Sequence, residues 1–184
     1  MNRTKLAIVD TFWQLLEEKP YNKITVQDIV DQCQVNRNTF YYHFQDIPSL
    51  AEWSVEKWTD EVIGDKKDFD SPASCIVYMA EECVKRKKAL LHLYRSAKKE
   101  LFIEYISKMG YHIITFYMKN RTDNFILSEE KAKILVRYYK CTFIGIILDW
   151  LEEDATYDLV SFCQQFCELF SGTGEKALLK CEVP

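Results

Sequence analysis

The pattern of apolar and polar positions predicts a helix in almost every part of the chain. From Thr4 to Lys19 apolar residues recur at helical spacing, and Pro20 ends the pattern. The apolar positions of this first stretch are Ile8, Val9, Phe12, Leu15 and Leu16. Further helices are predicted at about 25–33, 36–44, 46–64, 71–85, 88–96, 99–119, 128–152 and 156–171, the last one stopped by a glycine at 172. The expected fold is all-α, with about nine helices.

Two short helices follow the first one and are joined by a tight turn. Thr25 and Asp28 have the spacing of a capping box, and Asn36 can cap the second short helix through its side-chain oxygen. Asp46 then caps a fourth helix, which has Pro48 in its first turn. Two short helices packed on a longer preceding one form a helix-turn-helix.

The segment NRNTFYYHF, residues 36–44, divides its aromatic residues between two faces of the second short helix. Phe40 and Phe44 are four residues apart and share a face, which Val35 can join. Arg37, Asn38, Tyr41 and Tyr42 point away from that face. The alternative is that the whole segment is core, but a core segment should not begin with three polar residues. A face directed into a DNA major groove explains the pattern better.

The outward side chains suit contacts with DNA. Arg37 can bind guanine O6 and N7 or a phosphate, and Asn38 suits adenine N6 and N7. The two tyrosines offer hydroxyl groups to phosphates and ring faces to thymine methyl groups, and His43 can donate to a phosphate. Thr25 and Gln27 lie at a helix N-terminus, where phosphate binds favourably.

The sequence ITVQDIVDQCQVNRNTFYYHFQDIPSL resembles the signature of the TetR family of bacterial transcription regulators, and the resemblance extends from about Lys5 to Trp53. It implies an N-terminal three-helix DNA-binding domain over residues 1–47 and a C-terminal helical ligand-binding and dimerisation domain over 48–184. The DNA contacts that it implies are Thr25, Gln27, Asn36, Arg37, Asn38, Thr39, Tyr41, Tyr42 and His43. The segment GIILDWL is similar to a subgroup that includes regulators of dihydroxyacetone kinase operons.

Three features depart from the family pattern. Gln34 stands where the turn normally has glycine, so it must adopt a left-handed or strained conformation. Ile47 stands where the family commonly has a phosphate-binding lysine. Residues 1–50 contain five basic and six acidic side chains, and the whole chain has a net charge of −4. These charges argue against a protein that simply coats nucleic acid, and they predict a shallow salt dependence of DNA binding.

The C-terminal half carries apolar residues on more than one helix face. A helix of this kind must be buried on several sides, and a second copy of the chain can cover one of them. The predicted dimer-interface residues are Phe143, Ile144, Ile147, Leu148, Leu151, Phe162, Phe166 and Phe170. The alternative is a larger core within one subunit. The dimer is the arrangement that the family resemblance implies.

The family resemblance also implies a small-molecule effector that binds among the middle helices. Amphipathic residues at helical spacing are candidates for lining its pocket, although each of them also suits ordinary core packing. They are Tyr78, His92, Tyr94, Tyr105, His112, Phe116 and Tyr138.

No pattern in the sequence predicts an enzyme, a cofactor or a metal site. The three histidines and the acidic pairs match no catalytic motif. The seven cysteines include no CxxC and are expected to be buried thiols; Cys163 and Cys167 could share a helix face, but no further metal ligand lies nearby in sequence. The chain shows no signal peptide and no apolar stretch long enough for a bilayer, so a cytoplasmic protein is expected.

Together these features predict a homodimeric, sequence-specific DNA-binding transcriptional regulator. A repressor modulated by a small molecule is the expected form. The alternatives are a TetR-like protein with weakened DNA binding that acts through protein contacts, and a transcriptional activator.

Overall fold

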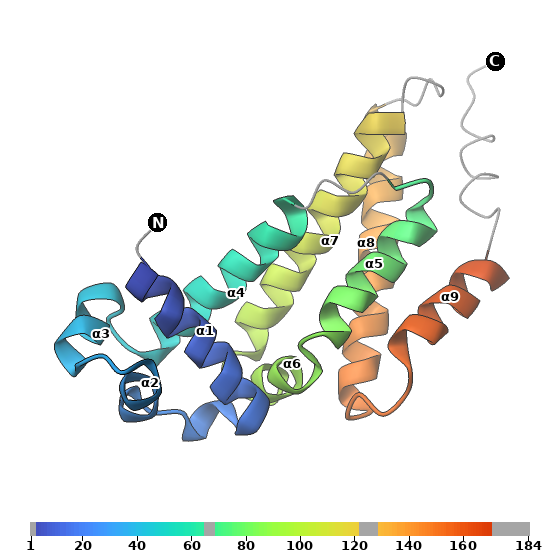
Figure 1. Cartoon of the computed structure of the whole chain (residues 1–184). Helices are drawn as coiled ribbons and strands as arrows, with labels where there is room; N and C mark the ends of the chain where they lie inside the picture. Colours follow the sequence, from blue (N-terminus) through green and yellow to red (C-terminus); the bar gives the residue numbers. More distant parts are fainter. Residues whose placement is uncertain (1–2, 65–68, 122–128, 171–184) are drawn as a thin grey trace, which may run out of the picture. The chain divides into compact units, whose positions relative to one another are not determined.

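The computed structural model describes residues 3–64, 69–121 and 129–170, which form nine α-helices and one short 3-10 helix, with no strand in these ranges (Figure 1). The elements are α1 (Arg3–Glu18), η1 (Tyr21–Lys23), α2 (Val26–Cys33), α3 (Arg37–His43), α4 (Ile47–Gly64), α5 (Pro72–Val84), α6 (Lys87–Tyr94), α7 (Lys99–Arg121), α8 (Glu129–Glu152) and α9 (Leu159–Leu169). The all-α prediction is confirmed, and the helix ends differ from the predicted ones by about three residues or fewer. The predicted stop at residue 172 lies outside the described residues.

Side chains just before the helices explain where several of them begin. Each cap below supplies an oxygen that accepts from a backbone N–H of the first turn, which has no partner within the helix. The pairs are Thr25 with Asp28, Asn36 with Thr39, Asp46 with Ser49, Ser71 with Ser74, and Asp158 with Ser161. The predicted caps at Thr25, Asn36 and Asp46 are confirmed.

The chain divides into two compact units. The first takes the described residues up to Glu61 together with Arg86–Tyr105, and the second takes Val62–Lys85 and the described residues from Ile106 onward. The first unit therefore includes α6 as well as the N-terminal helices. The predicted domain boundary at residue 47 concerns function rather than compactness and stays a prediction.

In the first unit, α1 is the central helix and contacts both α2 and α6. Its predicted apolar face is buried, with Ile8, Phe12 and Leu16 at 0% exposure. On α6, the Ala89 N–H donates to Glu17 Oε1 at 3.3 Å, and His92 Nδ1 lies 2.6 Å from the Leu16 carbonyl oxygen. Polar contacts and apolar burial thus hold α6 against the end of α1.

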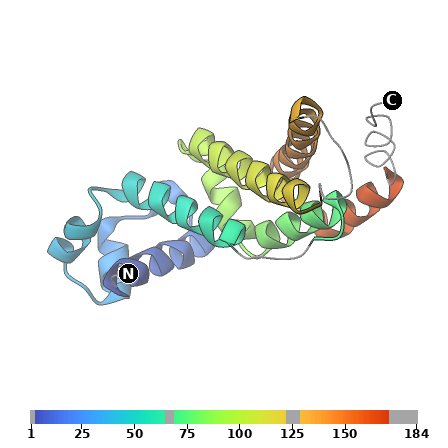
Figure 2. The ribbon, with the colours of Figure 1, turned by 90° about the horizontal axis from the view of Figure 1, so that it is seen from above.

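The second unit has its core between α5, α8 and α9, and α5 lies beside α9 (Figures 1 and 2). Its largest fully buried side chains include Phe143 and Trp150 of α8 and Met79 of α5. A Cβ on Gly110 of α7 would lie 3.3 Å from Phe143 Cδ1, so glycine permits the close approach of α7 and α8 here.

The cysteines follow the predicted pattern only in part. Cys75, Cys83 and Cys163 are buried, and burial raises the pKa of Cys75 and of Cys163 to about 12, which keeps these thiols protonated. Cys141 is exposed on α8, so the prediction of a buried thiol is wrong there. It lies on the side of α8 opposite Trp150, beyond the reach of the core.

Candidate nucleic-acid interface

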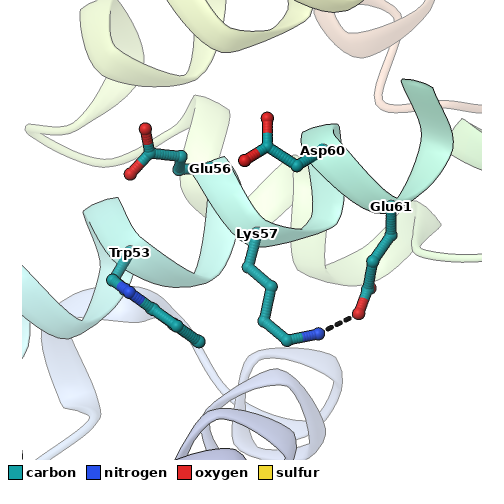
Figure 3. A pocket seen from close by; sticks show the side chains of 5 residues that line it. All are labelled: Trp53, Glu56, Lys57, Asp60 and Glu61. Carbon is teal, nitrogen blue, oxygen red and sulfur yellow. Dashed lines mark hydrogen bonds and ion pairs between the residues drawn. The ribbon is translucent and has the colours of Figure 1, made fainter. Parts of the chain in front are cut away.

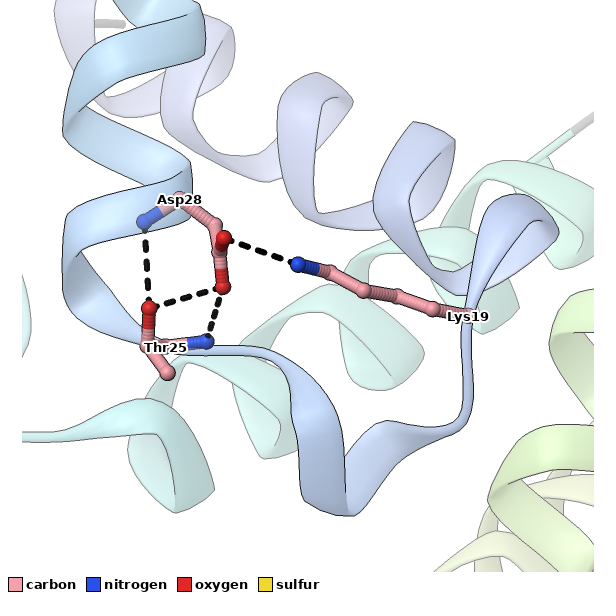
Figure 4. Close-up of polar contacts among 3 residues, drawn as sticks. All are labelled: Lys19, Thr25 and Asp28. Carbon is pink, nitrogen blue, oxygen red and sulfur yellow. Dashed lines mark hydrogen bonds and ion pairs between the residues drawn. The ribbon is translucent and has the colours of Figure 1, made fainter.

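The start of α2 is fixed by a capping box that an ion pair extends (Figure 4). The Asp28 N–H donates to Thr25 Oγ1 at 3.2 Å, and the Thr25 N–H donates to Asp28 Oδ2 at 2.7 Å. Lys19 Nζ lies 2.8 Å from Asp28 Oδ1. The hydrogen bond from Lys19, followed by those from Thr25, lowers the pKa of Asp28 to about 2. The carboxylate therefore links the C-terminal end of α1 to the N-terminal end of α2.

The turn between α2 and α3 depends on a strained glutamine. Gln34 has φ 57° and ψ 39°, the left-handed conformation predicted from its place in the sequence. The N–H of the next residue, Val35, donates to the Val30 carbonyl at 3.0 Å and closes the end of α2. The two short helices are thus joined at a tight, defined angle.

Helix α3 presents two distinct faces. Phe40 is fully buried and Phe44 is 5% exposed, with ring centroids 6.1 Å apart. On the other side Tyr41 is 55% exposed and Tyr42 is 81% exposed. The division of NRNTFYYHF into an inward and an outward face is therefore confirmed, and Val35 joins the inward face only in part.

The inward face is anchored by residues from other helices. The Phe44 ring packs against Trp53 of α4 at a centroid distance of 6.0 Å, and Lys5 Nζ of α1 lies 4.1 Å from the Trp53 ring centroid and 5.1 Å from that of Phe44. A cation over an aromatic face is attracted by the ring quadrupole. Lys5 thus helps to hold the end of α3 and is not simply a solvated charge.

The predicted DNA contacts fall into two groups in the structure. Arg37, Asn38, Tyr41 and Tyr42 are exposed on α3, and His43 is half-buried with its ring 4.9 Å from that of Tyr42. Thr25 and Asn36 use their side-chain oxygens as helix caps, and Thr39 Oγ1 donates to Asn36 Oδ1 at 3.0 Å. Only the side chains of the first group therefore have no role in capping a helix.

Sequence reasoning missed Asp31, which belongs to a hydrogen-bonded chain with Gln27 and Arg37 at this surface. Arg37 does not extend alone from α3, because its Nε and Nη2 both donate to Gln27 Oε1, at 2.9 and 2.6 Å. Gln27 Nε2 in turn donates to Asp31 Oδ1 at 2.5 Å. The four-residue spacing of Gln27 and Asp31 indicates that their side chains can meet on α2. Spacing along the sequence does not show that Gln27 also binds Arg37 on α3.

The residues predicted to line an effector pocket are not brought together. His92, Tyr94 and Tyr105 lie in the first unit, and the other four lie in the second. Tyr78 and Tyr94 are buried, while Phe116 and Tyr138 are 41% and 49% exposed. The effector site stays a prediction.

A pocket of about 350 Å³ lies along α4 instead, lined by Trp53, Glu56, Lys57, Asp60 and Glu61 (Figure 3). Trp53 and Lys57 are directed to one side of α4, Glu56 and Asp60 are directed to the other, and Lys57 is paired with Glu61. Burial raises the pKa of Tyr105, and the negative charges of nearby carboxylates, of which Glu56 has the largest effect, raise it further. None of the seven predicted effector residues lines this pocket.

The predicted dimer-interface residues also divide by exposure. Phe143, Ile147 and Leu151 are at most 1% exposed, and they pack into the core of the second unit. Phe162 and Phe170 are 41% and 45% exposed, and Ile144, Leu148 and Phe166 are half-buried. Of the predicted interface residues, only Ile144, Leu148, Phe162, Phe166 and Phe170 are therefore accessible on the surface of the subunit.

No three or more His, Cys, Asp or Glu side chains in the described ranges are arranged to hold a metal ion. No helix among the described residues is both long and apolar enough to cross a membrane.

Comparison with known proteins relates both halves of the chain to transcription regulators. The family model for bacterial regulatory proteins of the TetR family matches residues 8–52, and a model for the C-terminal region of transcriptional regulators in this family matches residues 70–172.

Two curated relatives share part of the sequence. DhaS of Lactococcus lactis subsp. lactis (strain IL1403), the HTH-type dhaKLM operon transcriptional activator, is 33% identical over 66 residues, which cover 36% of this chain and 35% of DhaS. YxbF of Bacillus subtilis (strain 168), an uncharacterized HTH-type transcriptional regulator, is 25% identical over 188 residues, which cover 96% of this chain and 47% of YxbF. The matched sequence segments thus span less than half the length of each of these two relatives.

Solved structures share the fold. The dihydroxyacetone kinase operon activator DhaS has a TM-score of 0.79 at 17% identity, with 98% of this chain and 99% of DhaS covered. FadR of Bacillus subtilis in complex with stearoyl-CoA has a TM-score of 0.64 at 16% identity, with 91% of this chain and 98% of FadR covered. The match of the family models over most of the chain, joined to a helix-turn-helix with an exposed polar face, identifies this protein as a transcription regulator of the TetR family whose α1–α3 form its DNA-binding helix-turn-helix.

Proposed function

We propose that the chain is a homodimeric repressor that recognises a specific operator through α3. The observation that carries this proposal is the two-sided character of α3, which buries Phe40 and Phe44 while exposing Arg37, Tyr41 and Tyr42. A helix with this division is anchored from behind and presents donors and ring faces outward, as entry into a major groove requires. A regulator of this kind acts where the chromosome is, in the cytoplasm.

A dimer supplies the second recognition helix. The accessible apolar group on α8 and at α9, which includes the half-buried Leu148 and the exposed Phe162 and Phe170, is a surface that a two-fold axis can pair with itself. Two recognition helices separated by about 34 Å would read half-sites one helical turn apart. Doubling the contacts offsets the small number of cations in each subunit.

The same surface also serves an activator, and that is the second candidate. The Lactococcus lactis relative is named as an activator of the dhaKLM operon, a property of that protein. Whether a bound regulator represses or activates depends on where its operator lies relative to the promoter. Mapping the bound site against the transcription start distinguishes the two outcomes.

A small-molecule effector is a further part of the proposal. A ligand that binds better to the conformation that does not fit DNA lowers DNA affinity by the ratio of its two affinities. FadR of Bacillus subtilis, which shares the fold, was solved in complex with stearoyl-CoA. Three of the predicted effector residues, His112, Phe116 and Tyr138, are exposed in the second unit, where a ligand could reach their side chains.

The test measures by fluorescence anisotropy how tightly the full chain binds the DNA flanking its gene and a random duplex of equal length. The measurement is repeated at several salt concentrations. We expect the flanking DNA to be preferred, with a slope of log affinity against log salt of about −4 or shallower, because each subunit offers few cations. Tyr42→Ala should weaken binding to the preferred site by about tenfold, since it removes an outward contact.

Tyr111→Ala is the matched control, because Tyr111 is a 50% exposed tyrosine of α7. It should leave the affinity unchanged. A wild-type chain that shows no preference over random duplex at low salt would rule out the proposed function.

A further inference from the structure

Three exposed side chains on α2 and α3 form a chain of hydrogen bonds. Two N–H groups of Arg37, on Nε and Nη2, converge on Gln27 Oε1, and Gln27 Nε2 donates to Asp31 Oδ1. Arg37 is the first residue of α3, whereas Gln27 and Asp31 lie one turn apart on α2. The network therefore crosses from the first helix of the helix-turn-helix to the recognition helix.

The chemistry of the three groups allows only one orientation of the Gln27 amide. A guanidinium only donates hydrogen bonds, and a carboxylate only accepts them. Gln27 satisfies both neighbours only with its oxygen toward Arg37 and its nitrogen toward Asp31. Without the Asp31 carboxylate, the amide nitrogen would have no acceptor in the network, and the contact with Arg37 alone would hold the Gln27 side chain in place.

This orientation decides which edge of Arg37 is presented outward. The side edge of the guanidinium, made by Nε and Nη2, is held by Gln27. The end edge, made by Nη1 and the second N–H of Nη2, remains for another partner. Two parallel N–H groups on one edge match the O6 and N7 acceptors of guanine.

We propose that Asp31 is a positioning residue for specificity, which acts through Gln27 to hold the end edge of Arg37 ready for a bidentate contact with a guanine. This inference rests on the proposed function, because it assumes that α3 reads DNA. It also changes the role of Gln27, which becomes mainly the support of Arg37. The Oε1 of Gln27 already accepts two hydrogen bonds, and Nε2 has one N–H left for a phosphate.

The proposal predicts two effects of opposite sign for Asp31. Its negative charge repels phosphates, so removing the charge strengthens binding to any duplex. Removing the carboxylate also releases the Gln27 amide, which weakens the choice of guanine. A purely structural role of Asp31 would not combine tighter binding to any duplex with a weaker preference for guanine.

The experiment begins with selection of a preferred site from random duplexes by the full wild-type chain. Arg37→Ala identifies the base pair that Arg37 reads, as the position at which preference is lost. Dissociation constants are then measured for the site and for the same site with that base pair exchanged, using wild type, Asp31→Ala and Asp10→Ala, because alanine removes both the charge and the acceptor for Gln27. Asp10 is an exposed carboxylate of α1 outside the network, so its variant matches the change in charge.

We expect Asp31→Ala and Asp10→Ala to bind random duplex about twofold more tightly than wild type. At the base pair read by Arg37, Asp31→Ala alone should lose about fivefold in discrimination, because it removes the hydrogen bond that supports Gln27. Asp31→Ala should have no further effect on this discrimination in the Arg37→Ala background, because its action passes through Arg37.

A second measurement tests the network without DNA. In the unbound wild-type chain, NMR should show slower exchange of the Arg37 Nε–H with water than of the Arg3 Nε–H, and Asp31→Ala should reduce this difference. Equal exchange of the two arginines in the wild type overturns the inference. So does an Asp31→Ala variant that discriminates between base pairs as Asp10→Ala does, while the proposed function stands. A wild-type chain with no base preference at all overturns both.

Discussion

Gln34 holds a left-handed backbone conformation at the point where the chain turns from α2 to α3. For an L-residue with a side chain this conformation costs roughly 1–2 kcal/mol, because Cβ approaches the following carbonyl oxygen. The turn tolerates this because Val35 and the flanking helices fix the backbone on both sides. The strain is therefore stored at the joint of the helix-turn-helix.

Gln34→Gly should increase the free energy of unfolding by about 0.5–1 kcal/mol. Glycine removes the steric cost but loses about 0.5–1 kcal/mol of backbone entropy on folding. Urea denaturation followed by circular dichroism measures the change.

Gln164→Gly is the control, since Gln164 is exposed within α9 and should lose about 1 kcal/mol when replaced by glycine. If Gln34→Gly is destabilised as much as Gln164→Gly, the strain assigned to Gln34 is absent.

At the residue scale, the sequence predicted features that depend on neighbours along the chain. The caps at Thr25 and Asn36 and the conformation of Gln34 follow from chemistry within about four residues. The hold of Gln27 on Arg37 joins residues ten positions apart, and no local pattern fixes which rotamer a long side chain adopts. The exposure of Cys141 was missed because the register of a helix apolar on several sides leaves more than one face free to point inward.

Helix α3 has only seven residues, too few for an isolated helix in water. Its stability comes from Phe40 and Phe44, from the Asn36 cap and from Lys5 and Trp53 behind it. Helix α2, with eight residues, depends in the same way on its capping box and on Lys19. The DNA-reading elements are thus secured by contacts at their ends and backs.

The junction of α1 and α2 should respond to acid through Asp28. Its pKa in the folded protein is about 2, below the ordinary value of about 3.9, because the Lys19 hydrogen bond favours the carboxylate. The stabilisation is therefore fully present above about pH 5 and is lost as the pH falls from about 4 to about 2. Asp28 is partly exposed, so the contribution is about 1 kcal/mol.

Urea denaturation of wild type and Asp28→Asn between about pH 6 and pH 2.5 measures this contribution. The difference in unfolding free energy should be constant at the upper end and should shrink toward the acid end. Lys19→Met should remove much of the pH dependence, because Lys19 is the largest cause of the lowered pKa. A difference that does not change with pH would contradict the assignment.

The helix boundaries were predictable because the residues that start and end a helix lie close to it in the sequence. Pro20, Gly64 and Pro72 mark ends and starts that the structure places within a few residues. The assignment of α6 to the first compact unit was not predictable, because it depends on the contact of α6 with α1 across more than seventy positions. Periodicity gives a helix and its apolar face but not the partner of that face.

For the whole molecule, the accessible apolar group on α8 and at α9 makes the oligomeric state measurable. In the proposed dimer, Phe162→Glu should raise the dissociation constant by about a hundredfold or more, because a two-fold axis would place the new charge in the interface twice. Sedimentation velocity at micromolar concentration measures the change.

Phe116→Glu is a matched control, because Phe116 and Phe162 are both 41% exposed. It should leave the dimer intact. A wild-type chain that sediments only as a monomer at these concentrations would exclude the dimer.

The predicted dimer interface shows what sequence reasoning cannot give for the whole molecule, namely which apolar helix face remains on the surface of the subunit. Apolar stripes identified α8 and α9 as helices with more apolar surface than one core needs. They did not separate Phe143 and Ile147, which fill the subunit's own core, from Ile144 and Leu148, which stay accessible. Adjacent faces of one apolar helix are chemically alike, and only the packed structure distinguishes them.

The hydrogen bonds of Arg37 have a consequence for how an operator preference can change during evolution. Tyr41 and Tyr42 stand on α3 without a partner on α2 among the hydrogen bonds described above, so either can be exchanged in a single mutational step. Arg37 is coupled to Gln27 and Asp31, so exchanging it leaves an amide and a carboxylate fitted to a group that is gone. If α3 reads the operator as proposed, the half-site should diverge one substitution at a time at the bases contacted by Tyr41 and Tyr42, and by correlated substitutions at positions 27, 31 and 37 at the bases contacted by Arg37.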